Sequence, residues 1–150
     1  MDTTTVLIDV AILTPIIAVI GILAFSKKPN LREAISLIAG VTLLVINLKL
    51  YSSFNQGAAL SRQWLEILPG LNLSFRVDAL GLLFGLVASL LWPVTTLYAI
   101  GYMRGHNEDH QTRFYACFAI AIAAVMAIAY AENLFTLFIF YEVLSLCTYP

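Results

Sequence analysis

Long apolar runs separated by short polar segments dominate the chain. A helix needs about 20 mostly apolar residues to cross the hydrocarbon core of a bilayer. None of the runs alternates in the manner of a β-barrel strand, so helices are the spanning elements that the pattern indicates. It predicts an all-α polytopic membrane protein, a single membrane domain over 1–150, with five transmembrane helices over residues 6–25, 34–54, 79–101, 112–131 and 133–150.

One segment between the predicted helices has a different pattern. From Leu71 to Asp78 apolar and polar residues alternate for eight positions, which is typical of a half-buried strand. Pro69 and Gly70 precede it as a turn signal, and Trp64–Leu68 can supply a partner strand. We therefore expect a small β-hairpin within the 60–78 loop, on the outer surface of the bundle.

Composition supports the membrane interpretation. Hydrophobic residues make up 61% of the chain and charged residues 11%, whereas a soluble domain has about 25% charged residues. The net charge is −1, which gives no electrostatic support for binding nucleic acid. The two cysteines, Cys117 and Cys147, lie in apolar runs without C-x-x-C spacing and indicate neither a disulfide framework nor a zinc site. The expected surroundings are a lipid bilayer.

The basic residues predict an orientation. With the N-terminus outside, the inner side carries five Lys and Arg residues and the outer side carries three, which agrees with the positive-inside tendency. The first span lacks a basic start and a small-residue cleavage site, so we expect it to be retained. The chain is predicted to be a multi-pass protein of the inner (plasma) membrane. The inner residues are Lys27, Lys28, Arg32, Arg104 and Arg113, and the outer residues are Lys49, Arg62 and Arg76.

Glu142 is the charged residue expected deepest in the membrane, whereas the other charges are expected at interfaces. It lies nine residues after Asn133, about 14 Å along a helix, near the middle of the bilayer. A carboxylate there must face protein or water. Ser145 and Tyr149 lie within about 60° of it around the helix, so the three form a polar stripe. Glu142 is either a proton-handling group or a neutral carboxyl that joins helices.

A cationic partner for Glu142 is not evident within the spans. Lys49, Arg104 and Arg113 all lie near span ends, where their side chains can reach the interface. We expect the partner to lie beyond residue 150 or in another subunit.

The other acids have simpler interpretations. Asp78, at the start of the third span, is placed to cap that helix, and Asp9 and Glu132 are expected at the interface or at a helix end. His106 and His110, with two acids between them, could hold a metal, but buffering or interface contacts are the favoured interpretation.

Two features of the third span concern helix packing. Pro93 is expected to kink it, and Gly81-x-x-x-Gly85 allows close helix contact. Nucleotide-binding, iron–sulfur and metalloprotease motifs are absent from the sequence, so we expect no cofactor and no metal.

Five segments in order resemble the N-terminal part of the proton-conducting antiporter-like family. This family includes the large membrane subunits of respiratory complex I, the equivalent subunits of membrane-bound hydrogenases, and the A and D subunits of Mrp-type cation/proton antiporters. Within it, residues 141–149 resemble the D type more closely than the distal subunit of complex I. The segments are residues 75–83, 98–105, 113–115, 131–135 and 141–149.

The resemblance implies a larger protein and assigns roles to two acids. Family members have about fourteen core helices with the N-terminus outside, so residues 1–150 are expected to be an N-terminal fragment that includes neither helix repeat in full. The family glutamate on the fifth helix translocates protons and pairs with a lysine on the seventh helix, and Glu142 matches it. Asp78 matches the aspartate that opens the third helix and is expected to do more than cap.

Three functions remain open. The first is proton/cation translocation, with protons and Na⁺ or K⁺, as part of a multisubunit cation/proton antiporter together with other membrane subunits. The second is a proton-pumping subunit of NADH:quinone oxidoreductase or a membrane-bound hydrogenase, in which case the redox site lies on other subunits. The third is a scaffold without transport, in which Glu142 is a structural acid.

Overall fold

The computed structural model describes residues 3–58, 60–106 and 108–149, which form five helices and one β-hairpin. Four of these helices are long and apolar enough to cross a membrane, and α5 is a shorter apolar helix. The predicted architecture is therefore confirmed. The elements in order are α1 (Thr3–Ala24), α2 (Pro29–Asn55), β1 (Ser61–Leu68), β2 (Leu71–Arg76), α3 (Ala79–His106), α4 (Gln111–Ala129) and α5 (Leu134–Thr148).

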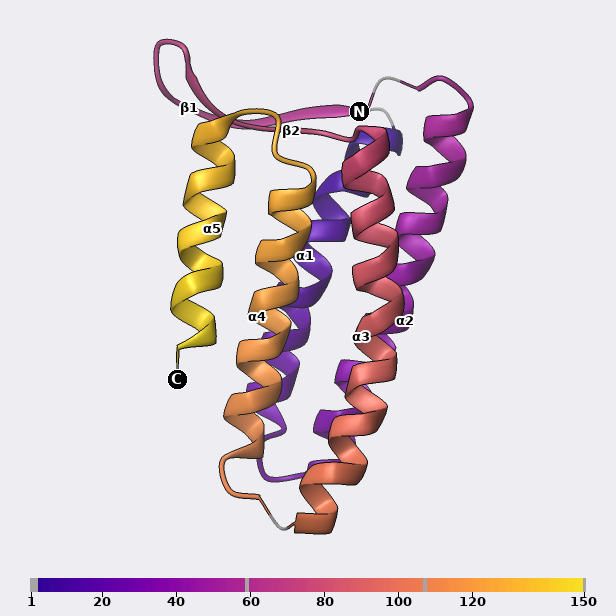
Figure 1. Ribbon diagram of the computed structural model, residues 1–150, viewed down its shortest axis with the longest axis vertical. Coiled ribbons are helices and arrows are strands. Elements are labelled where there is room, and N and C mark those ends of the chain that lie inside the picture. The colour runs from indigo at the N-terminus through magenta and orange to yellow at the C-terminus, as the bar shows by residue number, and fades with distance from the viewer. Residues whose placement is uncertain (1–2, 59, 107, 150) are drawn as a thin grey trace.

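The helices stand side by side as one bundle. Helix α1 packs against α2 and α4, α2 packs against α3, and α4 packs against α5. Figure 1 shows α5 at the edge of the bundle and the hairpin lying across one end. We call that end the hairpin end. The opposite end, where α1 joins α2 and α3 leads to α4, is the loop end.

Local sequence features account for three of the helix starts. Pro29 is the first residue of α2, where its missing N–H removes no helix bond. The Asp78 carboxylate accepts a bond of 2.6 Å from the backbone N–H of Gly81, so the predicted cap of α3 is confirmed. The Asn133 side chain caps α5 in the same way, accepting from the N–H of Thr136 at 2.8 Å.

The hairpin turns at Gly70, whose positive φ of 85° favours glycine. Strand β2 continues its hydrogen bonding into the turn between α4 and α5. The N–H of Arg76 donates to the Tyr130 carbonyl (2.7 Å), and the N–H of Glu132 donates to the Ser74 carbonyl (3.0 Å). The N–H of Ser74 also donates to the Thr136 hydroxyl (3.1 Å). The hairpin is thus bound to residues about sixty positions later in the chain.

The Gly81-x-x-x-Gly85 motif allows α3 and α4 to approach closely. A Cβ atom at Gly81 would overlap the backbone carbonyl of Ala129, and one at Gly85 would overlap the Tyr130 hydroxyl. The predicted helix contact is therefore confirmed.

Candidate proton-handling residue and buried polar clusters

Glu142 lies near the middle of α5, on a face that is exposed in this chain. Ser145 and Tyr149 are exposed as well, and Tyr149 retains 92% of its accessible surface. The Ser145 hydroxyl donates to the Tyr141 carbonyl (3.0 Å), one turn earlier. All three members of the expected polar stripe are therefore open to contact from outside the five helices.

Lys49, Arg104 and Arg113, the basic residues near span ends, do not contact Glu142. Arg104 is bonded to Glu33 and Asn30, while Lys49 and Arg113 are exposed and form no ion pair within the described ranges. The carboxylate of Glu142 likewise forms no ion pair or hydrogen bond with residues 3–58, 60–106 or 108–149. Its cationic partner remains a prediction.

Three other acids have structural partners at the hairpin end. Asp9 forms an ion pair with Arg62 (3.2 Å) and accepts a hydrogen bond from Trp64 Nε1 (2.6 Å), which ties α1 to β1. Glu132 pairs with Arg76, which ties β2 to the turn before α5. Both residues therefore have structural partners within the described part of the chain, and their position at the membrane interface stays a prediction. Asp78 uses one carboxylate oxygen for its cap and has no bond to Glu142.

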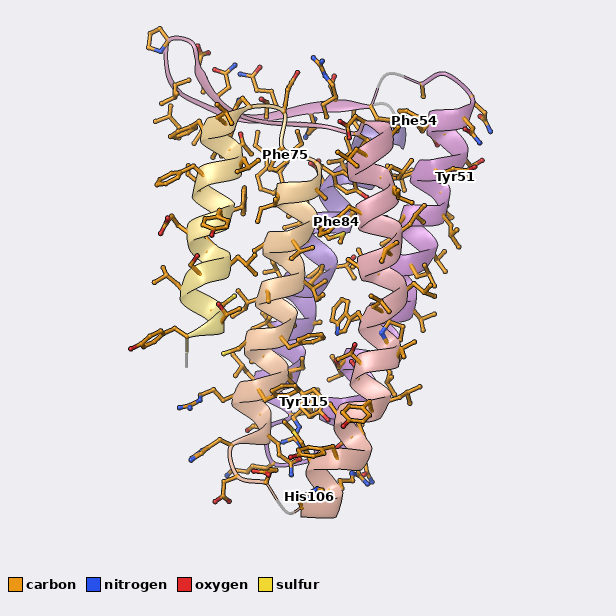
Figure 2. All side chains as sticks on the ribbon, in the orientation of Figure 1. Tyr51, Phe54, Phe75, Phe84, His106 and Tyr115 are labelled. Carbon is orange, nitrogen blue, oxygen red and sulfur yellow. The ribbon has the colours of Figure 1, made fainter. Side chains whose placement is uncertain are left out.

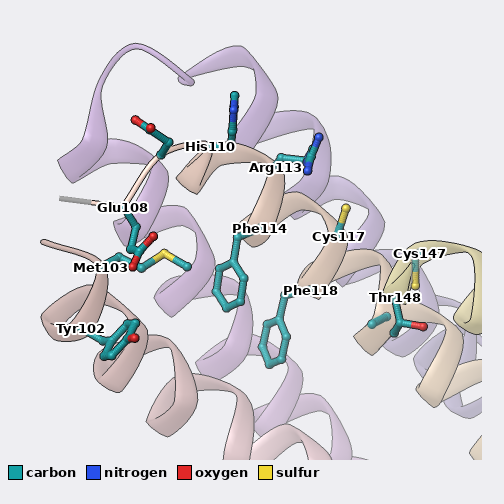
Figure 3. Close-up of a pocket in the computed structure, with 12 residues that line it drawn as sticks. Tyr102, Met103, Glu108, His110, Arg113, Phe114, Cys117, Phe118, Cys147 and Thr148 are labelled. Carbon is teal, nitrogen blue, oxygen red and sulfur yellow. The ribbon is translucent and has the colours of Figure 1, made fainter. Parts of the chain in front are cut away.

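The two histidines lie at the loop end, and both are exposed. The His106 ring stacks on Tyr102, with 4.5 Å between ring centroids, and His110 begins α4 with a left-handed backbone (φ 59°). Within the described ranges, no three His, Cys, Asp or Glu side chains are grouped as metal ligands. Figure 3 shows His110 and Arg113 at the rim of a hollow that Cys117 and Cys147 also line, from α4 and α5.

A buried charge cluster at the loop end was not expected from the sequence. Helix α2 begins at Pro29 and not at residue 34, so Arg32 and Glu33 lie inside it, each 4% exposed. Glu33 accepts two bonds from Arg104, from Nη2 (2.5 Å) and Nε (3.2 Å). It also lies 3.7 Å from Arg32. These three charges join the start of α2 to the end of α3.

Arg32 connects the cluster to α4. Its two terminal nitrogens donate to the Thr112 hydroxyl and the Gln111 side chain, each at 2.8 Å. Its guanidinium also lies 5.2 Å from the centre of the Tyr115 ring, within reach of a cation–π interaction. Figure 2 places Tyr115 among the helices at this end, with His106 farther out. Arg32 therefore lies within α2 and not before it, as the span predicted from residue 34 implied, and its head group is bonded to α4.

A second polar cluster lies in the core near the hairpin end. Asn47 is fully buried and donates to the Gly85 carbonyl (3.0 Å), while the Tyr130 hydroxyl donates to Asn47 Oδ1 (2.8 Å). The sequence does carry a signal for a polar face on α2. Glu33, Ser36, Gly40 and Asn47 recur at helical spacing, and all four are buried on one face of α2.

The four long apolar helices of the fold define a multi-pass membrane protein. Residues 64–115 match the family described as "NADH-Ubiquinone oxidoreductase (complex I), chain 5 N-terminus". A solved structure, the membrane-bound sulfane sulfur reductase, an archaeal respiratory membrane complex, has the same fold. The TM-score is 0.74 at 16% identity, over 93% of this chain and 21% of that one.

Two curated relatives are antiporter subunits by name. The chain is 29% identical over 146 residues to "Putative antiporter subunit mnhA2" of Staphylococcus saprophyticus, which covers 93% of this chain and 18% of the relative. It is 30% identical over 148 residues to the A/B subunit of a probable K(+)/H(+) antiporter of Rhizobium meliloti, covering 95% of this chain and 14% of the relative. The chain thus spans less than a fifth of either relative's length.

The chain is similar to antiporter A subunits along nearly its whole length, and residues 64–115 match the N-terminal family of complex I chain 5. The resemblance found in the sequence is confirmed. Both relatives are A-type subunits by name, whereas residues 141–149 alone favour the D type.

Proposed function

We propose that these helices belong to an antiporter-like subunit that moves protons across the membrane in exchange for Na⁺ or K⁺, and that Glu142 takes up and releases the proton. The observation that carries the proposal is the position of Glu142, exposed on a helix otherwise made almost entirely of apolar and aromatic residues. A carboxylate that faced hydrocarbon at this depth would be costly, so this face has protein or water against it.

The polar stripe supports the same conclusion. Ser145 and Tyr149 lie on the same exposed face as Glu142 and offer hydroxyl groups within one and two turns of it. Hydroxyl groups and water can relay a proton to and from a carboxyl group, which an apolar surface cannot. The names of the relatives favour a cation/proton antiporter over a scaffold.

The test is Glu142→Gln in the full-length protein assembled with its partner subunits. Gln keeps the size of the side chain and removes its ability to bind and release a proton, so we expect cation-induced proton flux in everted vesicles to fall to near background. Glu66→Gln is the matched control, because Glu66 is an exposed hairpin acid without an ion pair in the described part of the chain. Unchanged flux in E142Q vesicles would refute the proton-handling role.

The second candidate is a membrane subunit of a redox-driven proton pump. The description of the matched family, a complex I chain, favours it. In that case flavin and iron–sulfur subunits would co-purify with the protein, and proton flux would need an electron donor. In the antiporter case a cation gradient alone would drive the flux.

A further inference from the structure

A shallow pocket at the loop end collects positive charge. Lys27, Lys28 and Arg104 line it, together with Asn30 and Gln111, and none of the described residues that line it is acidic. We call it the basic pocket. Its walls come from the α1–α2 connection, the end of α3 and the start of α4, so residues about eighty positions apart form one surface.

The two lysines are available to a ligand. Both Lys27 and Lys28 are exposed, and neither forms an ion pair or side-chain hydrogen bond with any described residue. Glu33, the acid of the buried charge cluster, is already bonded to Arg104.

Arg104 is fixed in place. Nε and Nη2 donate to the Glu33 carboxylate, and Nη2 also donates to Asn30 Oδ1 (2.5 Å). Its remaining nitrogen, Nη1, has no bond to a described residue, and the side chain is 48% exposed. A guanidinium held in this way presents a donor at little further cost in side-chain entropy. The buried charge cluster therefore orients one wall of the pocket.

We expect the basic pocket to lie in the headgroup region of a bilayer. It lies at the end of four helices of membrane-spanning length. Leu31, an exposed apolar residue, lines the pocket itself, and the exposed rings of Tyr98 and Tyr102 lie within the last turns of α3. Tyrosines collect at the interface between hydrocarbon and water. A ligand in the basic pocket would contact both apolar and cationic side chains.

We propose that the basic pocket binds the phosphate group of an anionic phospholipid from the surrounding bilayer. Three cations without an acid among the lining residues match an anionic headgroup, and the membrane-facing helices beside them accommodate its acyl chains. Basic pockets between transmembrane helices are suited to this class of ligand. The site is independent of Glu142, which lies on another helix.

The test is lipid retention by the purified protein. The protein in mild detergent is mixed with equal amounts of phosphatidylglycerol and phosphatidylcholine, and native mass spectrometry measures which lipid stays bound. We expect the wild type to retain phosphatidylglycerol about fivefold over phosphatidylcholine, and Lys27→Gln/Lys28→Gln to lose most of that preference. Lys49→Gln is the control, because Lys49 is exposed near the opposite end of α2.

The same measurement also gives the results that would overturn the proposal. Equal retention of the two lipids by the wild type, or the same preference in the double variant, overturns the proposal. So does displacement of phosphatidylglycerol by inorganic phosphate, which would show a site for the free ion. The side chains of both lysines are exposed and form no bonds with described residues, so the double variant is expected to fold, and circular dichroism checks this. Because no transport is measured, the result does not depend on the proposed function.

Discussion

At the residue scale, the buried charges differ from Glu142 because they are paired within the bundle. Arg32 and Glu33 are buried, and their charges are satisfied within the bundle. Glu142 is exposed on an apolar helix and has no ion pair in the described part of the chain. A paired buried charge cannot change its protonation without breaking its bonds, whereas an open carboxyl can. This contrast makes Glu142 the better candidate for proton handling and Glu33 a structural residue.

The bond between Tyr130 and Asn47 gives a prediction about stability. Tyr130→Phe would remove the hydroxyl that donates to the fully buried Asn47 side chain and leave that oxygen unsatisfied. We expect the free energy of unfolding to fall by about 1–2 kcal/mol, measured by titration with a denaturing detergent.

Tyr149→Phe is the control for this prediction. It removes the same hydroxyl from a side chain that is 92% exposed and should leave the midpoint of unfolding unchanged. If the two variants unfold at the same detergent fraction, the buried bond contributes nothing measurable to stability.

At the element scale, the glycines of α3 allow it to pack closely against α4. The Cβ that Gly81 lacks would overlap a backbone carbonyl of α4, which cannot rotate away. Gly81→Ala should therefore push α3 from α4 and lower the free energy of unfolding by about 1–3 kcal/mol, although alanine is the better helix former.

Gly101→Ala is the matched control in the same helix. Nothing lies within 4 Å of the Cβ that it would add, so the variant should be as stable as the wild type or slightly more stable. Both variants are compared by thermal unfolding in the same detergent. Equal melting temperatures for the two variants would show that the close approach of α3 to α4 does not contribute to stability.

The elements that could be predicted from the sequence are those that depend on interactions between residues close together in the chain. The helices and the hairpin were predicted because apolar run length, alternation and the turn at Pro69-Gly70 are local signals. The start of α2 was missed because Arg32 and Glu33 read as loop charges. Their partners, Gln111, Thr112 and Arg104, lie more than seventy residues later, and a sequence pattern does not show which distant side chain will satisfy a charge.

At the scale of the whole molecule, the two ends of the bundle differ in chemistry. Lys27, Lys28 and Arg113 at the loop end form no ion pair with described residues, whereas toward the hairpin end Arg62 and Arg76 are paired with acids and Lys49 is not. Unpaired positive charge favours the cytoplasmic side. We therefore keep the prediction that the N-terminus and the hairpin face outward.

Labelling of introduced cysteines tests this orientation. Glu66→Cys in the hairpin should react with a membrane-impermeant maleimide in intact cells, whereas Lys27→Cys should react only after permeabilisation. The native Cys117 and Cys147 are partly buried, and the unmodified protein gives their background. The opposite pattern of labelling would reverse the orientation and place the basic pocket outside.

The attachment of β2 to the α4–α5 turn has a consequence for the order of events during synthesis. Asn72 and Ser74 are made about sixty residues before Asn133 and Thr136, whose side chains bond to them. While α3 and α4 are still emerging from the ribosome, only water can satisfy these groups of the hairpin. The hairpin therefore reaches its final position after α4 has been inserted, when the first residues of α5 become available to bind it.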